Sequence, residues 1–135
     1  MLTKALAYAI AAGFMFSLAG CNLSTETAVT EAAQKRWDAL IIGDTEQAYH
    51  YYTTAFQQSM PYDHFKNNVR GIGLWSHAKV SKVNCEASGK SCKVDVDVTV
   101  SMKMRGLSTP VDTTDRVSET WVREGWFSDW RYVKQ

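Results

Sequence analysis

The sequence has few prolines, few cysteines and almost no net charge. Its 135 residues include two prolines and three cysteines, whereas 45% of the residues are hydrophobic and 12% are aromatic. Disordered chains are typically rich in proline and poor in aromatic residues, so this composition argues against disorder. The length is enough for one domain with a hydrophobic core and a short additional segment.

The two signs of charge are nearly balanced. There are fifteen lysines and arginines and fourteen aspartates and glutamates, and Lys4 is the one charged residue before residue 21. From residue 21 onward the formal charge is therefore zero. Nucleic-acid-binding proteins usually carry a basic excess, so we expect no nucleic-acid partner. The same balance argues against adhesion to anionic lipid by charge alone.

The N-terminal apolar stretch is shorter than the roughly 20 residues that span a bilayer as a helix. It covers residues 5–19, ALAYAIAAGFMFSLA, and follows Lys4, which is the pattern of a signal peptide. It leads into Leu18-Ala19-Gly20-Cys21, which resembles the lipobox of bacterial lipoproteins. The resemblance implies transfer of a diacylglyceryl group to the Cys21 sulfur, because the thiolate is the nucleophile. It also implies cleavage after Gly20 and acylation of the new amino group by a fatty acid such as palmitate. An ordinary secretory signal or an N-terminal transmembrane helix is the alternative.

The residue after the cysteine bears on which membrane would hold the protein. In enteric bacteria an aspartate at this position favours the inner membrane, and here the residue is Asn22. We therefore expect the outer membrane, with the protein facing the periplasm. Residues 21–27 are interpreted as the lipidated cysteine and a short polar tether. More than one acyl chain on one residue should anchor the protein stably.

Helices are predicted in the first half of the domain, which we place at residues 28–135. Ala33, Trp37, Leu40 and Ile41 recur at the spacing of one helix face, and Lys35, Arg36 and Asp38 are expected to point away from it. Gly43 is expected to end this helix and Asp44 to cap a second one. A short third helix, residues 62–70, follows Pro61.

Strands are predicted in the second half, where apolar and polar residues alternate. The expected strands are residues 78–85, 93–105, 111–124 and 128–133. In the second of them the valines and methionines from Val94 to Met104 form one face. Asp95 and Asp97 fall on the opposite, solvent-exposed face. Helices followed by an antiparallel meander indicate an α+β fold, with N-terminal helices packed on a curved four-stranded antiparallel sheet.

Cys85 and Cys92 flank the turn between the first two predicted strands. They would lie opposite each other across the hairpin, where a disulfide can close, and the periplasm favours the oxidised form. A two-cysteine metal or redox site is the alternative, but no further thiol or histidine stands at metal-ligand spacing. We therefore predict a structural disulfide, no metal site and no cofactor.

Several motifs together resemble the nuclear transport factor 2-like superfamily, in particular its small bacterial lipoproteins. They are the Gly43-Asp44 break, the tyrosine-rich second helix and the closing segments Trp121-Val122-Arg123-Glu124 and Trp130-Arg131-Tyr132-Val133. The resemblance implies a cone-like roll with an apolar pocket at its mouth, and it allows a homodimer through the sheet face. Because this fold carries many unrelated activities, it does not determine the function.

Aromatic and methionine side chains are the candidates for lining that pocket, if the cone is open. They come from elements that should face one another: Tyr52, Phe56, Phe65, Trp75, Trp121 and Met102. No residue is assigned a catalytic role. Trp126-Phe127 in the last turn is a further candidate contact for a partner or a membrane surface.

Three functions remain open at this point. The leading hypothesis is a non-enzymatic, membrane-anchored periplasmic protein that binds a small apolar ligand or an envelope protein. The second is a small isomerase, cyclase or hydrolase that uses the cone cavity, which requires a buried acid or histidine there. The third is an accessory subunit of a larger envelope assembly that binds through its exposed sheet face.

Overall fold

The structure, a computed structural model, describes residues 21–125 and 129–135, with side chains from residue 25 onward. The predicted signal peptide, the Cys21 side chain and the Trp126-Phe127 contact lie outside what it describes. Eight elements follow one another along the chain: α1 Cys21–Ile42, α2 Thr45–Tyr49, α3 Thr54–Ser59, α4 Tyr62–Asn68, β1 Trp75–Cys85, β2 Ser91–Met102, β3 Val111–Glu124 and β4 Asp129–Val133.

The first helix is longer than predicted. Residues 21–27, interpreted above as a tether, form the first turns of α1. Its C-terminal end is where the sequence placed it: Gly43 has φ +81°, and the Asp44 N–H donates to the Ala39 carbonyl at 2.9 Å. Asp44 then caps α2 by accepting from the Gln47 N–H at 3.1 Å.

The predicted second helix is divided into α2 and α3. Between them, Tyr51 and Thr53 form backbone hydrogen bonds with Tyr132 of β4, and Thr53 begins α3 as its N-cap. The backbone groups that would have continued the helix are therefore used by a distant strand. The local sequence pattern does not predict this division, because it contains no information about hydrogen bonds to a distant strand.

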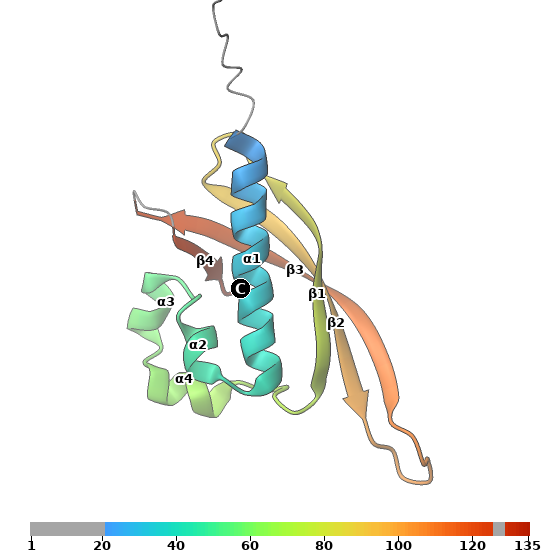
Figure 1. Cartoon of the computed structure of the whole chain (residues 1–135). Coiled ribbons are helices and arrows are strands. Elements are labelled where there is room, and N and C mark those ends of the chain that lie inside the picture. The colour runs from blue at the N-terminus through green and yellow to red at the C-terminus, as the bar shows by residue number, and fades with distance from the viewer. Residues whose placement is uncertain (1–20, 126–128) are drawn as a thin grey trace, which may run out of the picture.

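The four strands form one antiparallel sheet in the order β1-β2-β3-β4, and α1 crosses one of its faces while α2–α4 lie beside α1 (Figure 1). This is the α+β architecture expected from the sequence. The core lies between α1 and the inner face of the sheet. Its largest fully buried side chains are Trp121, Leu40, Val29, Val94, Val96 and Cys92.

The predicted disulfide is present between Cys85 and Cys92. The two residues are direct partners in the register of β1 and β2, so the bond closes the hairpin at its turn end. Among the described helices, none is both long and apolar enough to cross a membrane.

The ends of β2 and β3 run past the helices and join in a projecting hairpin (Figure 1), here called the distal arm, residues 101–118. Val94, Val96 and Val98 of β2 are buried, but Met102 on the same face is exposed. In β3 every residue from Val111 to Ser118 is exposed, and burial begins at Glu119. The arm is thus a sheet without a covering layer.

Candidate functional site

A buried ion pair stands at the centre of the cone. Arg36 of α1 and Glu119 of β3 approach to 2.8 Å, and their side chains are only 5% and 1% exposed. The expectation that Arg36 points away from the core was therefore wrong, whereas its neighbours Lys35 and Asp38 are exposed as expected. The reason is that α1 is covered on two sides, by the sheet and by the segment between α2 and α3 that carries Tyr52. The sequence pattern of α1 shows one apolar face, so it does not reveal that a second face of this helix is also buried.

Both oxygens of the Glu119 carboxylate accept hydrogen bonds. Oε1 accepts from Arg36 Nη1 at 2.8 Å and from the Trp37 indole N–H at 2.9 Å, and Oε2 accepts from the Trp121 indole N–H at 2.9 Å. Glu119 and Trp121 are two residues apart on β3, so they share the inner face of the sheet. Each oxygen of the carboxylate therefore already has a hydrogen-bond donor inside the core.

The Arg36 guanidinium is enclosed by aromatic rings. Nη2 donates to the Tyr52 hydroxyl at 2.9 Å, and the guanidinium carbon lies 3.9 Å from the centre of the Tyr132 ring. Burial by itself would lower the pKa of Arg36, but Glu119 and the oxygens of Tyr52 and Tyr132 raise it above its ordinary value. Arg36 is therefore charged, and the pair neutralises itself within the core.

A cavity of about 280 Å³ opens beside this cluster, with Tyr52 in its wall. Four of the six predicted pocket residues line it together: Tyr52, Phe56, Phe65 and Trp75. The Tyr52 ring stacks on Phe56 at 4.7 Å and meets Phe65 edge-on at 5.0 Å. The remaining lining residues are Met60, Asn68, Val69, Arg70 and Lys134.

Gly71 allows Trp75 to close one side of this cavity. At φ +104° it adopts a backbone conformation that residues with a side chain rarely take. A Cβ added there would lie 2.4 Å from the Trp75 ring. Trp75 in turn packs edge-on against Trp37 at 5.3 Å, which ties the cavity wall to the ion-pair cluster.

The other two predicted pocket residues lie elsewhere. Trp121 is fully buried in the core, where its indole N–H donates to Glu119. Met102 is 45% exposed on the distal arm, because the helices that cover the inner face of β2 end before they reach it. Alternation placed Met102 on the correct face but could not show that nothing covers that part of the face.

The local sequence pattern does not reveal Arg36 and Glu119 as a pair. A signal for Glu119 was present, since it stands between Val117 and Trp121 on the same face of β3. An acid on the inner face of a strand needs a buried cation or several donors. Asp95 and Asp97 lie on the opposite face as predicted, and Asp97 pairs with Arg116 at 2.8 Å.

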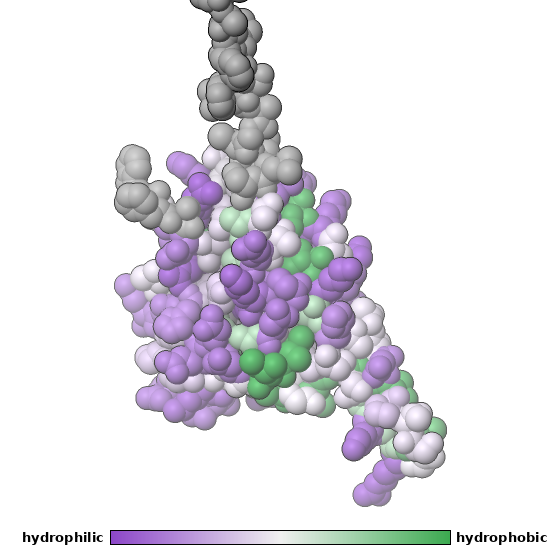
Figure 2. Space-filling view, in the orientation of Figure 1, coloured by the Kyte–Doolittle hydropathy of each residue, from purple (hydrophilic) through white to green (hydrophobic). Residues whose placement is uncertain are grey.

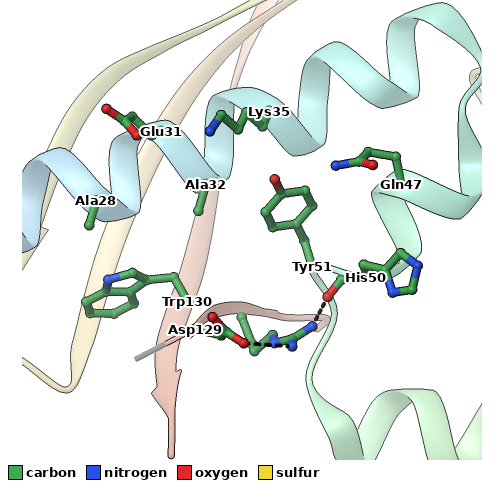
Figure 3. Close-up of a pocket in the computed structure, with 10 residues that line it drawn as sticks. Ala28, Glu31, Ala32, Lys35, Gln47, His50, Tyr51, Asp129 and Trp130 are labelled. Atoms are coloured by element: carbon green, nitrogen blue, oxygen red, sulfur yellow. Dashed lines mark hydrogen bonds and ion pairs between the residues drawn. The ribbon is translucent and has the colours of Figure 1, made fainter. Parts of the chain in front are cut away.

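A second, broader hollow of about 530 Å³ lies between α1 and β4 (Figure 3). Three of its lining residues contact one another: Arg131 donates to the His50 carbonyl and forms an ion pair with Asp129. Within the described residues, no cluster of three or more acids, histidines or cysteines is arranged to hold a metal ion.

No protein-family model matches the chain, and no curated protein matches it either. Solved structures, however, do match the chain. One, from Novosphingobium aromaticivorans and provisionally named a scytalone dehydratase, shares 14% identity with a TM-score of 0.57 and covers 82% of this chain and 80% of its own. Another is an NTF2-like protein of unknown function in nutrient uptake from Rhodospirillum rubrum, with 15% identity, a TM-score of 0.50 and coverage of 77% and 91%.

The fold is NTF2-like. The same architecture is found in the protein named a scytalone dehydratase and in the NTF2-like protein of unknown function. At this level of identity the likeness concerns the fold alone, so the function must be argued from the cavity and the residues around it.

Proposed function

We propose that this protein is a lipid-anchored, non-enzymatic binding protein of the cell envelope, and that the aromatic cavity holds its ligand. The observation that carries the proposal is the contrast between the cavity wall and the buried acid. Four aromatic rings line the cavity, while Glu119 is held by three donors and is absent from the lining. This arrangement can bind an apolar molecule but offers no free carboxylate to a substrate.

The lining favours a flat, apolar ligand with an acidic group. Stacked and edge-on rings provide the apolar surface, as in small-molecule sites generally. Arg70 and Lys134 supply two cations at the exposed margin, and the Lys134 ammonium lies 5.6 Å from the centre of the Phe56 ring. No acidic side chain is among the described lining residues, so the local charge is positive.

The anchor rests on the lipobox. Because α1 begins at Cys21 itself, acyl groups on that residue would hold the domain close to the membrane. This position suits a protein that collects a ligand from the periplasm or passes it to an envelope partner. Labelling cells with radioactive palmitate should mark the wild-type protein and leave Cys21→Ala unlabelled; equal labelling of both would exclude this anchor.

An isomerase, cyclase or hydrolase is the alternative. It would need an acid or a histidine aimed into the cavity. The described lining residues include neither, and His50, His64 and His77 are all exposed. Binding is therefore the better-supported function.

Two fluorescent probes with the same ring system test the binding site. Anilinonaphthalene sulfonate carries an anionic group, and N-phenylnaphthylamine does not. Wild type should bind the sulfonate more tightly, and Phe56→Ala should weaken both probes about tenfold, equivalent to about 1.4 kcal/mol. Lys134→Gln should weaken the sulfonate alone.

Val117→Ala is the matched control, since it removes an exposed apolar side chain that is not among the residues lining the cavity. It should bind both probes as wild type does. Unchanged affinity of Phe56→Ala for both probes, with an unchanged melting temperature, would show that the cavity is not the site and would overturn the proposal.

A further inference from the structure

β3 has an open edge. It pairs with β2 from Val111 to Val122, but on its other side β4 pairs with Thr120–Glu124 alone. Among the described residues, the edge from Val111 to Glu119 therefore has no strand beside it. Every residue from Val111 to Ser118 is also exposed. Such an edge presents unpaired N–H and C=O groups that can bind another strand.

The opposite edge of the sheet, formed by β1, is protected from pairing. The register of β1 is interrupted between Val80 and Lys82. The Gln34 side chain of α1 also donates to the Ala78 carbonyl at 2.9 Å and accepts from the Val80 N–H at 3.0 Å. Bulges and covering groups of this kind prevent edge-to-edge pairing. From Val111 to Glu119, β3 contains neither proline nor lysine, and its register with β2 is regular.

The sequence of this edge, Val-Asp-Thr-Thr-Asp-Arg-Val from Val111 to Val117, is nearly self-complementary. We propose that β3 pairs antiparallel with β3 of a second copy of this chain, with Thr114 opposite Thr114 on the twofold axis. In this register, Asp112 of each copy lies opposite Arg116 of the other copy. Val111 of each copy likewise lies opposite Val117 of the other. The two sheets become one continuous sheet.

Registers shifted toward the C-terminal end of β3 are less favourable. A twofold axis normal to the sheet keeps each face on its own side, so only residues of the same face can be opposite each other. Shifting the axis to Asp115 places two aspartates opposite each other, and shifting it to Arg116 does the same with two arginines. Like charges in directly opposite positions destabilise a strand pair, whereas opposite charges stabilise it.

The proposed register also completes contacts that a single copy leaves open. Arg116 has Asp97 of β2 on one side, and Asp112 of the second copy would lie on the other. Val111 and Val117 lie on the inner face of the sheet and are 36% and 37% exposed. Figure 2 shows hydrophobic and hydrophilic residues interspersed along this projecting arm.

This pairing differs from a dimer through the sheet face, because it uses the strand edge and leaves both faces of the sheet free. The twofold axis places the two α1 N-termini on opposite flanks of the pair. With the proposed anchor at Cys21, both copies would reach one membrane when the axis is normal to it.

Cysteine substitution in the full-length protein tests the register in cells. Residues directly opposite in an antiparallel pair have Cα atoms about 4.5–5.5 Å apart, which a disulfide can bridge. Thr114→Cys should therefore give a disulfide-linked dimer on non-reducing gels. Ser118 lies on the same face, but its two copies would be about 27 Å apart. Ser118→Cys should therefore form no cross-link and should run as a single chain on the same gels.

Charge substitutions in the Thr114→Cys background test the contact. Asp112→Arg should reduce the cross-linked fraction at least fivefold, because it places arginines opposite Arg116 while leaving the Asp97–Arg116 pair intact. Asp115→Arg, which would face Thr113, is the matched control and should cross-link as before.

Three results would overturn the proposal. One is no cross-link at Thr114→Cys while the protein accumulates normally. Another is a stronger cross-link at Asp115→Cys or Arg116→Cys, which would place the axis elsewhere. The third is a mixed disulfide between the Thr114→Cys variant and a different protein, which would assign this edge to another partner.

Discussion

The covered half of the sheet and the distal arm are built from the same two strands but have opposite environments. Val94, Val96 and Val98 of β2 are buried under α1, and a few residues further along Met102 is exposed. β3 changes in the same way at Glu119. Alternation thus determines which face a side chain occupies, whereas a covering helix determines whether that face is buried.

The two ion pairs add a comparison between two other regions, the buried inner face and the exposed outer face of the sheet. Arg36–Glu119 and Arg116–Asp97 both have a distance of 2.8 Å, but the first pair is almost inaccessible and the second has side chains 59% and 35% exposed. Exposed pairs are screened by water and contribute little, whereas removing one partner of a buried pair leaves an uncompensated charge. The same chemistry should therefore have very different effects in the two regions.

The largest effect is expected for Glu119→Gln. This substitution leaves the buried Arg36 charge unpaired and should lower the free energy of unfolding by about 3–5 kcal/mol. Urea denaturation monitored by tryptophan fluorescence measures it. The matched control, Asp97→Asn in the exposed pair, should change stability far less; equal losses for both variants would contradict the contrast between the regions.

Removal of the disulfide should have the next largest effect. Cys92 is buried at the covered end of the sheet, and the bond closes a short loop. In the loop-entropy description, a Cys85→Ala/Cys92→Ala double variant should lose about 2–3 kcal/mol. Comparing urea denaturation of this variant with that of oxidised and reduced wild type gives the value. A variant as stable as the oxidised protein would show that the hairpin needs no cross-link.

Two truncations on one face of β2 test the role of the covering layer directly. Val96→Ala removes buried methyl groups and should cost about 2 kcal/mol, whereas Met102→Ala on the arm should cost less than about 0.5 kcal/mol. The same denaturation assay measures both. Comparable losses would mean that the arm is packed against something, such as the second copy proposed above, and repeating the assay at several protein concentrations would reveal that partner.

Alkaline pH should act on the covered half. Burial raises the pKa of Tyr132 above its ordinary value near 10.0, although Arg36 opposes the shift. A raised folded-state pKa contributes stability that is complete below the ordinary phenol pKa and is lost as the pH rises through the folded-state value. Tyr132→Phe should therefore remove part of the decline in melting temperature above pH 10.

Acidic pH should act on the outer face of the sheet, with the smallest effect. The hydrogen bond from Arg116 lowers the pKa of Asp97 below its ordinary value of 3.8. The corresponding stability is present above that value and is lost as the pH falls through the folded-state pKa. Arg116→Gln should slightly reduce the loss of melting temperature below pH 4. An unchanged acid profile would mean that water screens this pair completely.

The elements that the sequence predicted well depend on neighbours along the chain. The Cys85–Cys92 disulfide followed from a single hairpin, and the end of α1 followed from Gly43 and Asp44. Tyr52, Phe56, Phe65 and Trp75 were also selected from the sequence, and the structure places them around one cavity. That this cavity binds a ligand remains a prediction.

The errors occurred where distant segments compete for the same groups. The sequence pattern predicts Arg36 outside the core because it shows only one apolar face on α1. In the structure a second layer, which includes Tyr52, covers another side of this helix. The division between α2 and α3 arises from hydrogen bonds to Tyr132, far along the chain. Met102 was placed correctly by face and incorrectly by burial.

The sequence by itself determined the order of helices and strands, the face of each strand and the cross-link, because spacing, turns and caps act within a few residues. The tertiary structure alone decided that Arg36 meets Glu119, which part of the sheet is covered and which edge of β3 remains open. The physical reason is that burial and pairing depend on residues distant in the chain, and a local pattern contains no information about them.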